Sequence, residues 1–554
     1  MVLRSLVLGL GGLLALPWTL HGSLQAQTAS GAGDDAIPIA RGGVRIRIAG
    51  QWNDWDKVFA DSAGASRRRL LLAGVGRSSF GTAALSQLAP AEQAIRELTG
   101  LSGFSLSLGT LEARGDVRQS TAPIAVDVGV TKRLSLTLLV PYVESRDNTQ
   151  LILNRAGTGA TVGVNPAFGS TAAAARAQNG QLLRQLAQAR TQLGAEIARC
   201  AATTATGCEA IRANAAGAQG LLQRAMTAQG AISTVYGDSV RGGAPVVPIT
   251  SNAAGAAVNA SLASLRTAFA AFGVMSLNET SLPAGATAVY GPGSLEAITG
   301  DSTFGLGYTR LGNTRRAGVG DIDLSATLLL FDSFGANQRR RLTNSSRALR
   351  STATVGWRFG TAAADDPLDA FDVPIGDGVN AAFARSTTDL IFNRALWMSA
   401  TVRVLQPFED NVMAAIPLRT DSTVFSAFGL GSVRRTLGSR MELEVAPRYA
   451  FGDFFGISAA YLYRRTSEST YEAVEPSPSS VPSLTSLTVP STTFQAASVG
   501  ISFSTLASYV RGRSRLPLEI IFTHTEPIRA SGGIVPTVAS DRLELRIHTG
   551  FPKR

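Results

Sequence analysis

The stretch IAVDVGVTKRLSLTLLVPY, residues 124–142, decides the fold class of this chain. Apolar side chains stand at every second position on both sides of Lys132 and Arg133, and the positions between them are mostly small or polar. Successive side chains of a β-strand point to opposite faces, so this pattern predicts two strands joined by a tight turn at Lys132-Arg133. One face of the predicted hairpin is apolar along its length, and the other face carries Asp127.

The same alternation recurs in segments of up to about ten residues, the length of a tilted membrane-spanning strand. These segments lie at 44–48, 322–330, 355–359, 396–404, 441–449, 457–463, 518–522 and 543–551. Aromatic residues recur near their ends, as the interfaces of a membrane favour: Trp52, Tyr142, Phe331, Trp357, Phe359, Tyr449 and Phe551. We therefore predict an all-β transmembrane β-barrel of about 12–16 antiparallel strands. A soluble β-sandwich, whose strands also alternate, is the alternative.

The polar face of the predicted strands supplies the candidate functional residues. Charge in the middle of a strand suits a water-filled interior, whereas an arginine on the lipid face would cost about 2–4 kcal/mol at the midplane. We expect twelve residues to line a pore: Arg45, Arg47, Asp127, Asp321, Asp323, Arg358, Arg403, Glu442, Glu444, Arg448, Glu544 and Arg546. Mixed rings of charge tune ion selectivity, and an excess of arginine favours anions weakly.

The N-terminal segment and the composition indicate where the chain works. Arg4 precedes an apolar run at 6–16, and Ala26 offers a small residue for cleavage, so residues 1–26 are typical of a secretory signal peptide; a short membrane anchor is the alternative. Charged residues make up only 16% of the chain, against about 25% in soluble domains. No later segment has 18 consecutive apolar residues. We expect a bacterial outer-membrane protein whose partners are membrane lipid and the barrel assembly machinery.

A helical period interrupts the strands. Apolar residues spaced by three and four at 182–197, 211–225 and 258–272 predict a helical hairpin and a third helix. Cys200 and Cys208 bracket the tip of the hairpin, and a disulfide is expected in an exported protein, with two separate thiols as the alternative. The expected layout is signal peptide 1–26, N-terminal linker 27–43, barrel 44–167, helical insertion 168–275, connecting loop 276–303 and barrel 304–554. The insertion is a cap or partner-binding arm, or a solvated loop elaboration.

Enzymatic and metal-binding motifs are not found in the sequence. The mature chain keeps two histidines, His524 and His548, too few for a site built from histidine and cysteine clusters, so we expect no metal and no cofactor. No nucleophile elbow, phosphate loop or zinc-binding helix occurs, and no enzyme is predicted. The net charge of +11 is nearly all arginine, but the arginines are scattered, so nucleic acid is not expected as a partner.

Three stretches resemble one known family. They are DVGVTKRLSLTLLVPYV at 127–143, GVGDIDL at 318–324 and VPIGDG at 373–378. They are similar to the strand, turn and Pro-Tyr ending, the Gly-Asp strand entry and the glycine-containing loop of the "MetA-pathway of phenol degradation" family of outer-membrane transporters. The resemblance covers about half of the chain, outside the insertion. It implies passage of small apolar or aromatic solutes. The alternatives are an adhesive outer-membrane protein whose helical arm binds a partner, and a soluble secreted β-rich protein.

Overall fold

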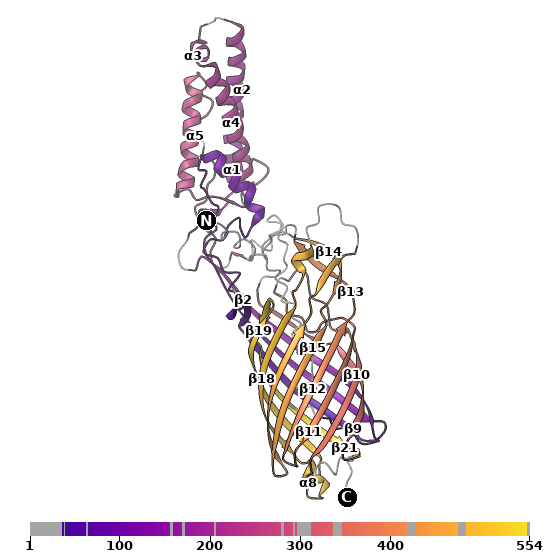
Figure 1. Cartoon of the computed structure of the whole chain (residues 1–554). Helices are drawn as coiled ribbons and strands as arrows, with labels where there is room; N and C mark the ends of the chain where they lie inside the picture. Colours follow the sequence, from indigo (N-terminus) through magenta and orange to yellow (C-terminus); the bar gives the residue numbers. More distant parts are fainter. Residues whose placement is uncertain are drawn as a thin grey trace, which may run out of the picture.

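The computed structural model describes residues 36–550 except for these gaps: 38, 63–64, 156–158, 169–171, 204–205, 279–281, 292–293, 296–311, 336–345, 370, 418–427 and 475–483. Within these residues, twelve antiparallel strands form a sheet that closes on itself, because β1 pairs with both β4 and β21 and β4 pairs with β5. The fold is therefore a β-barrel (Figure 1). The sandwich alternative is wrong, and the predicted barrel of about 12–16 strands is confirmed at its lower limit.

Each barrel strand pairs with the next barrel strand along the chain. The strands are β1 (Val44–Trp55), β4 (Leu111–Gly129), β5 (Leu134–Leu153), β9 (Ile322–Asp332), β10 (Ala348–Phe359), β11 (Ala381–Ile391), β12 (Leu396–Pro407), β15 (Arg440–Phe451), β16 (Phe455–Thr466), β18 (Thr492–Ser504), β19 (Leu518–Ser531) and β21 (Ala539–Thr549). The predicted hairpin is β4–β5, whose turn is closed by the Val130 N–H donating to the Leu134 carbonyl at 2.9 Å.

The two ends of the barrel differ. Several short turns, such as residues 130–133 and 452–454, lie at one end, which we call the turn end. The start of β1 and the end of β21 are also there. Long connections leave the other end, the loop end, where smaller sheets form: β2 (Lys57–Ser62), β3 (Ala65–Leu70) and β20 (Ile534–Pro536), and β13 (Asp410–Pro417), β14 (Phe428–Thr436) and β17 (Thr470–Ala473). A short strand, β8 (Thr314–Val319), prolongs the pairing along β5.

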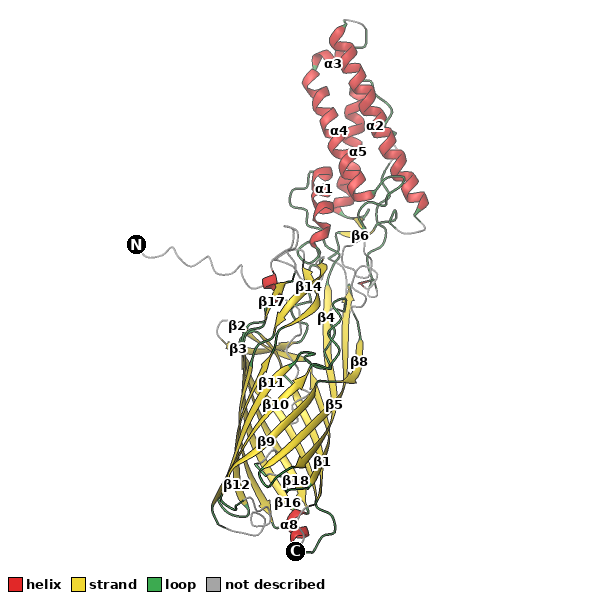
Figure 2. Cartoon of the chain, turned by 90° about the vertical axis from the view of Figure 1, so that its right-hand side faces the viewer, coloured by secondary structure: helices red, strands yellow, loops and turns green. Residues whose placement is uncertain are grey.

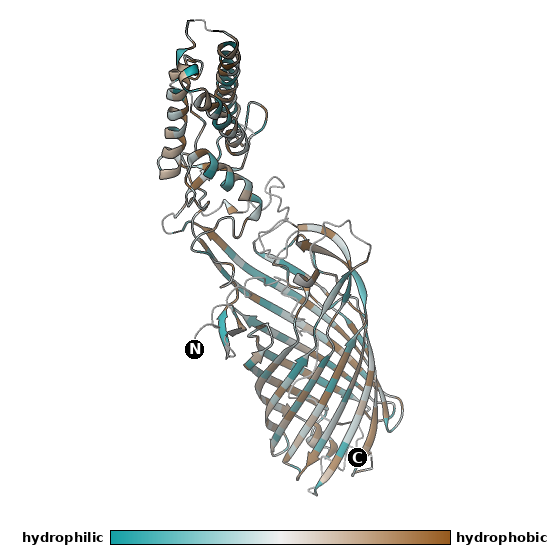
Figure 3. Cartoon of the chain, turned by 45° about the horizontal axis from the view of Figure 1, so that its top comes forward, coloured by the Kyte–Doolittle hydropathy of each residue, from teal (hydrophilic) through white to brown (hydrophobic). Residues whose placement is uncertain are grey.

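The barrel turns its apolar residues outward and its polar residues inward. On β10, Val355 is 63% exposed while the neighbouring Thr354 is 3% exposed. On β15, Met441, Leu443 and Val445 are exposed, and Glu442 and Glu444 are buried. Figure 3 shows the resulting alternation of apolar and polar residues along the strands.

Helices form an arm beyond the loop end (Figures 1 and 2). The arm contains α2 (Ala173–Ala202), α3 (Glu209–Ala213), α4 (Ala215–Tyr236) and α5 (Ala253–Ala271), as the helical period predicts, and Cys200 and Cys208 form a disulfide. The helix α1 (Ala89–Thr99) packs against α4 and α5 and was not predicted, because it lies in a segment assigned to the barrel. Two small elements, β6 (Val162–Val164) with β7 (Val246–Pro248), join the arm to its base.

The arm stands on the ends of β4 and β5, which continue pairing up to Leu111 and Leu153, far beyond the other strands. One apolar core fills the arm and its base. None of the described helices is long and apolar enough to cross a membrane.

Candidate functional site

The barrel interior carries a network of ion pairs that begins on β1 and β4. Asp127 is 2% exposed and accepts from Arg45 Nε at 2.7 Å, from Arg47 Nε at 3.0 Å and from the Thr137 hydroxyl at 2.7 Å. Strand alternation places all four side chains on the inner face, since neighbouring residues such as Ile48 and Val126 are exposed on the outer face. The carboxylate is thus satisfied by two guanidinium groups and one hydroxyl.

A second ion pair inside the barrel joins β9 and β10. Arg358 donates to Asp323 through both Nε and Nη2, at 2.8 and 3.0 Å. This two-point geometry fixes the planar guanidinium against the carboxylate and is stronger than a single contact. Arg358 also lies 3.9 Å from Asp377, which belongs to a loop at the barrel mouth.

On β12, β15 and β16 the charges share partners. Arg403 lies 3.4 Å from Glu442 and 3.0 Å from Glu444, and Arg464 donates to Glu442 at 2.8 Å. On β21, Glu544 accepts from Arg542 at 2.6 Å and from Arg546 at 2.9 Å. Glu442, Glu444 and Glu544 are therefore held by arginines of their own or neighbouring strands.

Asp321 lies apart from this network. It sits between β8 and β9, is fully buried, and accepts backbone N–H groups from Ala362 at 3.0 Å, Asp377 at 2.9 Å and Gly378 at 3.3 Å. It thereby fastens both ends of the connection between β10 and β11, residues 360–369 and 371–378, which we call the mouth loop. Two of the stretches that carry the family resemblance, 318–324 and 373–378, meet in this contact.

The mouth loop folds into the loop end of the barrel. Its Pro374 carbonyl accepts from Gln119 of β4, and Ile375 packs on Val143 of β5. Its residues Phe371 and Val373 belong to the same apolar core as the arm. The mouth loop thus links the barrel mouth with the base of the arm.

A buried carboxylate faces the mouth loop from β5. Asp147 lies five residues beyond the exposed Tyr142, is 2% exposed, and accepts from the Thr149 hydroxyl at 2.9 Å. Burial raises the pKa of Asp147 to about 7; the Thr149 hydrogen bond opposes this shift, and the charges of Asp369, Asp116 and Asp372 add to it. Among the described residues no arginine lies within ion-pair distance of Asp147, in contrast to Asp127, Asp323 and Glu544.

The barrel interior contains a cavity of about 100 Å³, lined by β1, β5, β9 to β12 and β15. Five arginines line it: Arg47, Arg358, Arg385, Arg403 and Arg440. The carboxylates of Asp323 and Glu442 and the apolar side chains of Leu139, Phe383 and Leu405 complete the wall. Arginines therefore outnumber carboxylates in this wall. We call it the central cavity.

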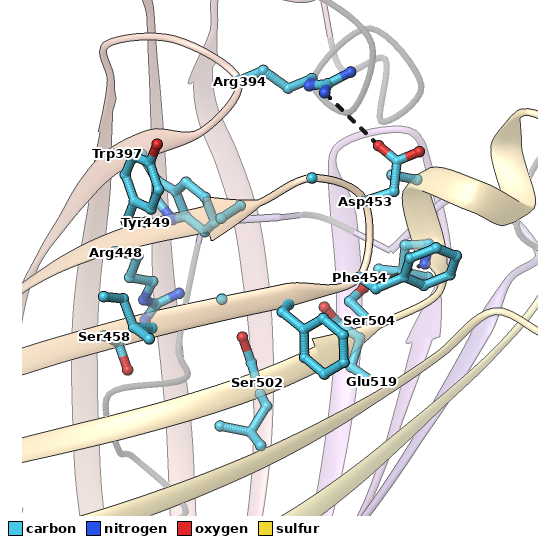
Figure 4. A pocket seen from close by; sticks show the side chains of 18 of the residues that line it. Arg394, Trp397, Arg448, Tyr449, Asp453, Phe454, Ser458, Ser502, Ser504 and Glu519 are labelled. Atoms are coloured by element: carbon cyan, nitrogen blue, oxygen red, sulfur yellow. Dashed lines mark hydrogen bonds and ion pairs between the residues drawn. The ribbon is translucent and has the colours of Figure 1, made fainter.

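A second cavity, of about 130 Å³, lies at the turn end beside α8 (Leu506–Val510). Figure 4 shows Arg448, Ser458, Ser502 and Glu519 on its wall, and the ion pair of Arg394 with Asp453 near its edge. Of the twelve predicted residues, Arg448 and Arg546 line this cavity.

Residues 36–37 and 39–40 enter the turn end of the barrel. The Ala36 N–H donates to Asp389 of β11 at 3.0 Å, and both residues are buried. The Ala40 carbonyl lies so close to Gly129 that a β-carbon there would sit 2.0 Å from it, so glycine is required on this stretch of the inner wall. This segment therefore occupies part of the lumen.

Several interior charges were not among the twelve residues predicted to line the pore: Arg385, Arg440, Arg464, Arg542 and Glu519. Arg385 belongs to β11, where serine and threonine at 386 and 388 stand on the outer face and hide the alternation. Arg464 and Glu519 lie on strands whose apolar rows were recognised, and extending the two-residue alternation along those strands would have found them. Phe551, the predicted terminal aromatic, lies outside the described residues.

No group of three or more histidine, cysteine, aspartate or glutamate side chains in the described part of the chain is arranged to hold a metal ion. The two histidines are paired with carboxylates: His548 lies 3.3 Å from Glu519, and His524, on the outer face, lies 2.8 Å from Asp541.

Comparison by sequence finds no protein-family model and no curated protein that matches this chain. Comparison of structures finds barrels. The COG4313 outer membrane channel from Pseudomonas putida F1 has 8% identity and a TM-score of 0.39 over 94% of this chain and 99% of that one. The toluene transporter TbuX from Ralstonia pickettii has 9% identity and a TM-score of 0.29, covering 93% and 90% of the two chains.

The translocator domain of the autotransporter NalP from Neisseria meningitidis has 6% identity and a TM-score of 0.28, covering 91% of this chain and 88% of that one. Similarity at this level carries no argument about function.

Proposed function

We propose that this chain is a bacterial outer-membrane channel for small solutes. The observation that carries the proposal is the closed barrel with an apolar outer face and a charged inner face. Every backbone N–H and C=O of a membrane-spanning sheet must be paired, and closure achieves this. An outer face that exposes Val355, Val499 and Ile501 by 61–63% suits lipid rather than water.

The central cavity supports passage of solutes that combine an apolar body with a negative charge. Guanidinium groups bind carboxylates through two parallel hydrogen bonds. Leu139, Phe383 and Leu405 add apolar surface beside them. The family resemblance points to apolar or aromatic solutes, and the arginines add a preference for an anionic group among them.

Planar-bilayer recording of the refolded mature protein tests this function. We expect discrete conductance steps and a weak preference for anions. Replacing Arg358 and Arg403 with glutamine removes two positive charges from the central cavity and should shift the reversal potential toward cations. The matched control is glutamine at Arg184 and Arg224, two exposed arginines of the arm, which should leave the potential unchanged. The absence of conductance would overturn the channel, and an unchanged potential in the first variant would overturn the role of the arginines.

The alternative of an adhesive protein is favoured by one observation, the tightly packed arm that projects beyond the barrel (Figure 2). In that case the barrel would be an anchor. Removal of residues 171–273 separates the two functions: a channel keeps its conductance without the arm, whereas an adhesive anchor loses partner binding and shows no conductance in either form.

A further inference from the structure

Three consecutive arginines lie on the flank of the barrel at its loop end. Arg67, Arg68 and Arg69 are exposed residues of β3, the outermost strand of the small sheet β20–β2–β3. This sheet contacts β19, and both views place it beside the barrel wall (Figures 1 and 2). Arg529 of β19 is exposed near the same place. Three of these arginines are adjacent in the sequence, and the packing of the small sheet on β19 adds Arg529 to the same flank.

Arg68 holds the strand in position. Its Nη2 donates to the Pro527 carbonyl of β19 at 2.7 Å, and its guanidinium lies 5.3 Å from the centre of the buried Phe59 ring. Arg67 and Arg69 pair across the hairpin with Ala60 and Val58, on the opposite face of the ribbon from Arg68.

Acidic groups do not neutralise this cluster. Among the residues that the structure describes, no carboxylate lies within ion-pair distance of Arg67, Arg69 or Arg529. The nearby Glu526 lies 3.3 Å from His524, and Asp56 lies 3.7 Å from Lys57. Arg67, Arg69 and Arg529 therefore have no ion-pair partner in the described part of the chain and can bind an external anion.

The outer face of the barrel indicates where the arginine cluster lies relative to the membrane. On β19 the apolar outer row ends at Phe522 and is followed by His524 and Glu526. On β1 the row ends at Trp52, which lies beside Asp541, the partner of His524 in the sheet. An aromatic residue at the change from apolar to charged marks the edge of the hydrocarbon layer.

The contact of Arg68 at Pro527 lies three residues beyond His524, which is about 10 Å along the strand and about 8 Å along the barrel axis at the usual tilt. The headgroup layer of a bilayer is about 5–8 Å thick. The arginines thus stand at the level of the phosphates.

Barrels of the bacterial outer membrane carry their long loops on the extracellular side, so the loop end of this barrel belongs to the outer leaflet. We propose that Arg67, Arg69 and Arg529 form a binding site for a phosphate-bearing lipid headgroup of that leaflet. Guanidinium groups match phosphate oxygens in charge and in geometry. Arg68 and Phe59 fix the strand, and the lipid phosphates supply the negative charge that this surface lacks. The site fastens the flank below the arm to the membrane. The inference rests on the membrane placement in the proposed function.

The test measures lipid binding to the full-length mature protein in detergent by native mass spectrometry. The probe is lipid A carrying two phosphates, compared with the same lipid after removal of both phosphates. We expect tight binding of the phosphorylated probe and at least about tenfold weaker binding by the variant Arg67→Ala/Arg69→Ala, which loses two charge-assisted contacts. The matched control, Arg184→Ala/Arg224→Ala, removes the same charge from the exposed surface of the arm and should bind as the wild type does.

Three results would overturn the proposal. The first is equal lipid affinity of the wild type and the Arg67→Ala/Arg69→Ala variant. The second is an equal loss of lipid affinity in the arm control. The third is displacement of the lipid by inorganic phosphate at equal concentration, which would indicate a site for free anions. Conductance is recorded from the same preparations. A protein that conducts but fails to bind lipid refutes the lipid site alone, whereas one that fails to conduct refutes the channel.

Discussion

The arm and the barrel of this molecule are built with opposite insides. In the arm, side chains such as Leu186, Phe269 and Ile232 are fully buried, and most exposed positions are polar or small. In the barrel, the arginines and carboxylates are buried, and valine, leucine and isoleucine are exposed. Both regions obey the same rule, that apolar surface leaves water, but only the barrel needs lipid to satisfy it.

This difference assigns separate roles to similar residues. An apolar residue stabilises the arm by being buried within the chain, and it stabilises the barrel by contacting the membrane. A charge inside the barrel is held by a partner on its own or a neighbouring strand, as Arg358 is by Asp323. Substitutions that exchange these environments therefore test the assignment directly.

The largest effect is expected from Phe269→Ala in α5. This side chain is 0% exposed in the arm core, so its removal leaves a cavity and should cost about 3–5 kcal/mol. The helical circular dichroism signal should melt earlier, while the heat-modifiable migration of the barrel stays unchanged. The matched control is Phe522→Ala, since Phe522 is 38% exposed on the outer face of the barrel. If both variants lowered the melting of the helices equally, the arm would not have an independent core.

The second effect concerns Asp147, at the junction of the two regions. Its pKa in the folded protein, about 7, lies above the ordinary 3.8, so the folded state holds the proton more tightly. Stability should therefore fall as the pH rises from about 4 to about 7. Asp147→Asn removes this penalty and should stabilise the base of the arm at pH 8 by at most about 4 kcal/mol, with little effect at pH 4. The melting temperatures of the variant and the wild type are compared at pH 4 and at pH 8. The same difference at both pH values would contradict a raised pKa of Asp147.

The third effect compares two exposed valines. Val355 is 63% exposed on the barrel and Val240 is 75% exposed at the base of the arm. Val355→Arg places a charge in lipid and should cost about 2–4 kcal/mol of barrel stability in vesicles, whereas Val240→Arg should change stability by no more than about 0.5 kcal/mol. Denaturant unfolding of the reconstituted protein measures both. A small effect at both positions would mean that Val355 does not face lipid.

Much of this contrast could be predicted from the sequence, because the two environments leave different periods. The two-residue alternation of 124–142 predicts the hairpin, and the spacing of Val258, Leu262 and Leu265 predicts a helix. The barrel strand β11 was missed because Ser386 and Thr388 stand where apolar residues mark the outer face of other strands. β18 was also missed, although Val499 and Ile501 alternate with Ser498, Gly500 and Ser502, and extending the two-residue pattern to this segment would have found it.

The interior site was predictable only in part. Alternation places a charge on the inner face, so Arg358 and Asp323 could be assigned there from the sequence, but pairing partners depend on the register between strands, which alternation does not give. The role of Asp321 depends on the mouth loop returning to it across about 40–60 residues of sequence. The short spacing of Arg67, Arg68 and Arg69 is visible in the sequence, but their height on the barrel follows only from the packing of β3 against β19.

The smallest effect is expected at the tip of the arm. The disulfide between Cys200 and Cys208 closes a short loop, so replacing both cysteines with serine should cost about 2–3 kcal/mol by freeing the unfolded tip. The loss should appear in the helical melt alone. The reduced wild type serves as the control, because it breaks the same bond without changing side-chain size and should melt at the same temperature as the variant. The barrel should lose its heat-modifiable migration at the same temperature in the variant, in the reduced protein and in the wild type. A lower temperature in either altered form would show that the arm and the barrel unfold together and do not form separate cores.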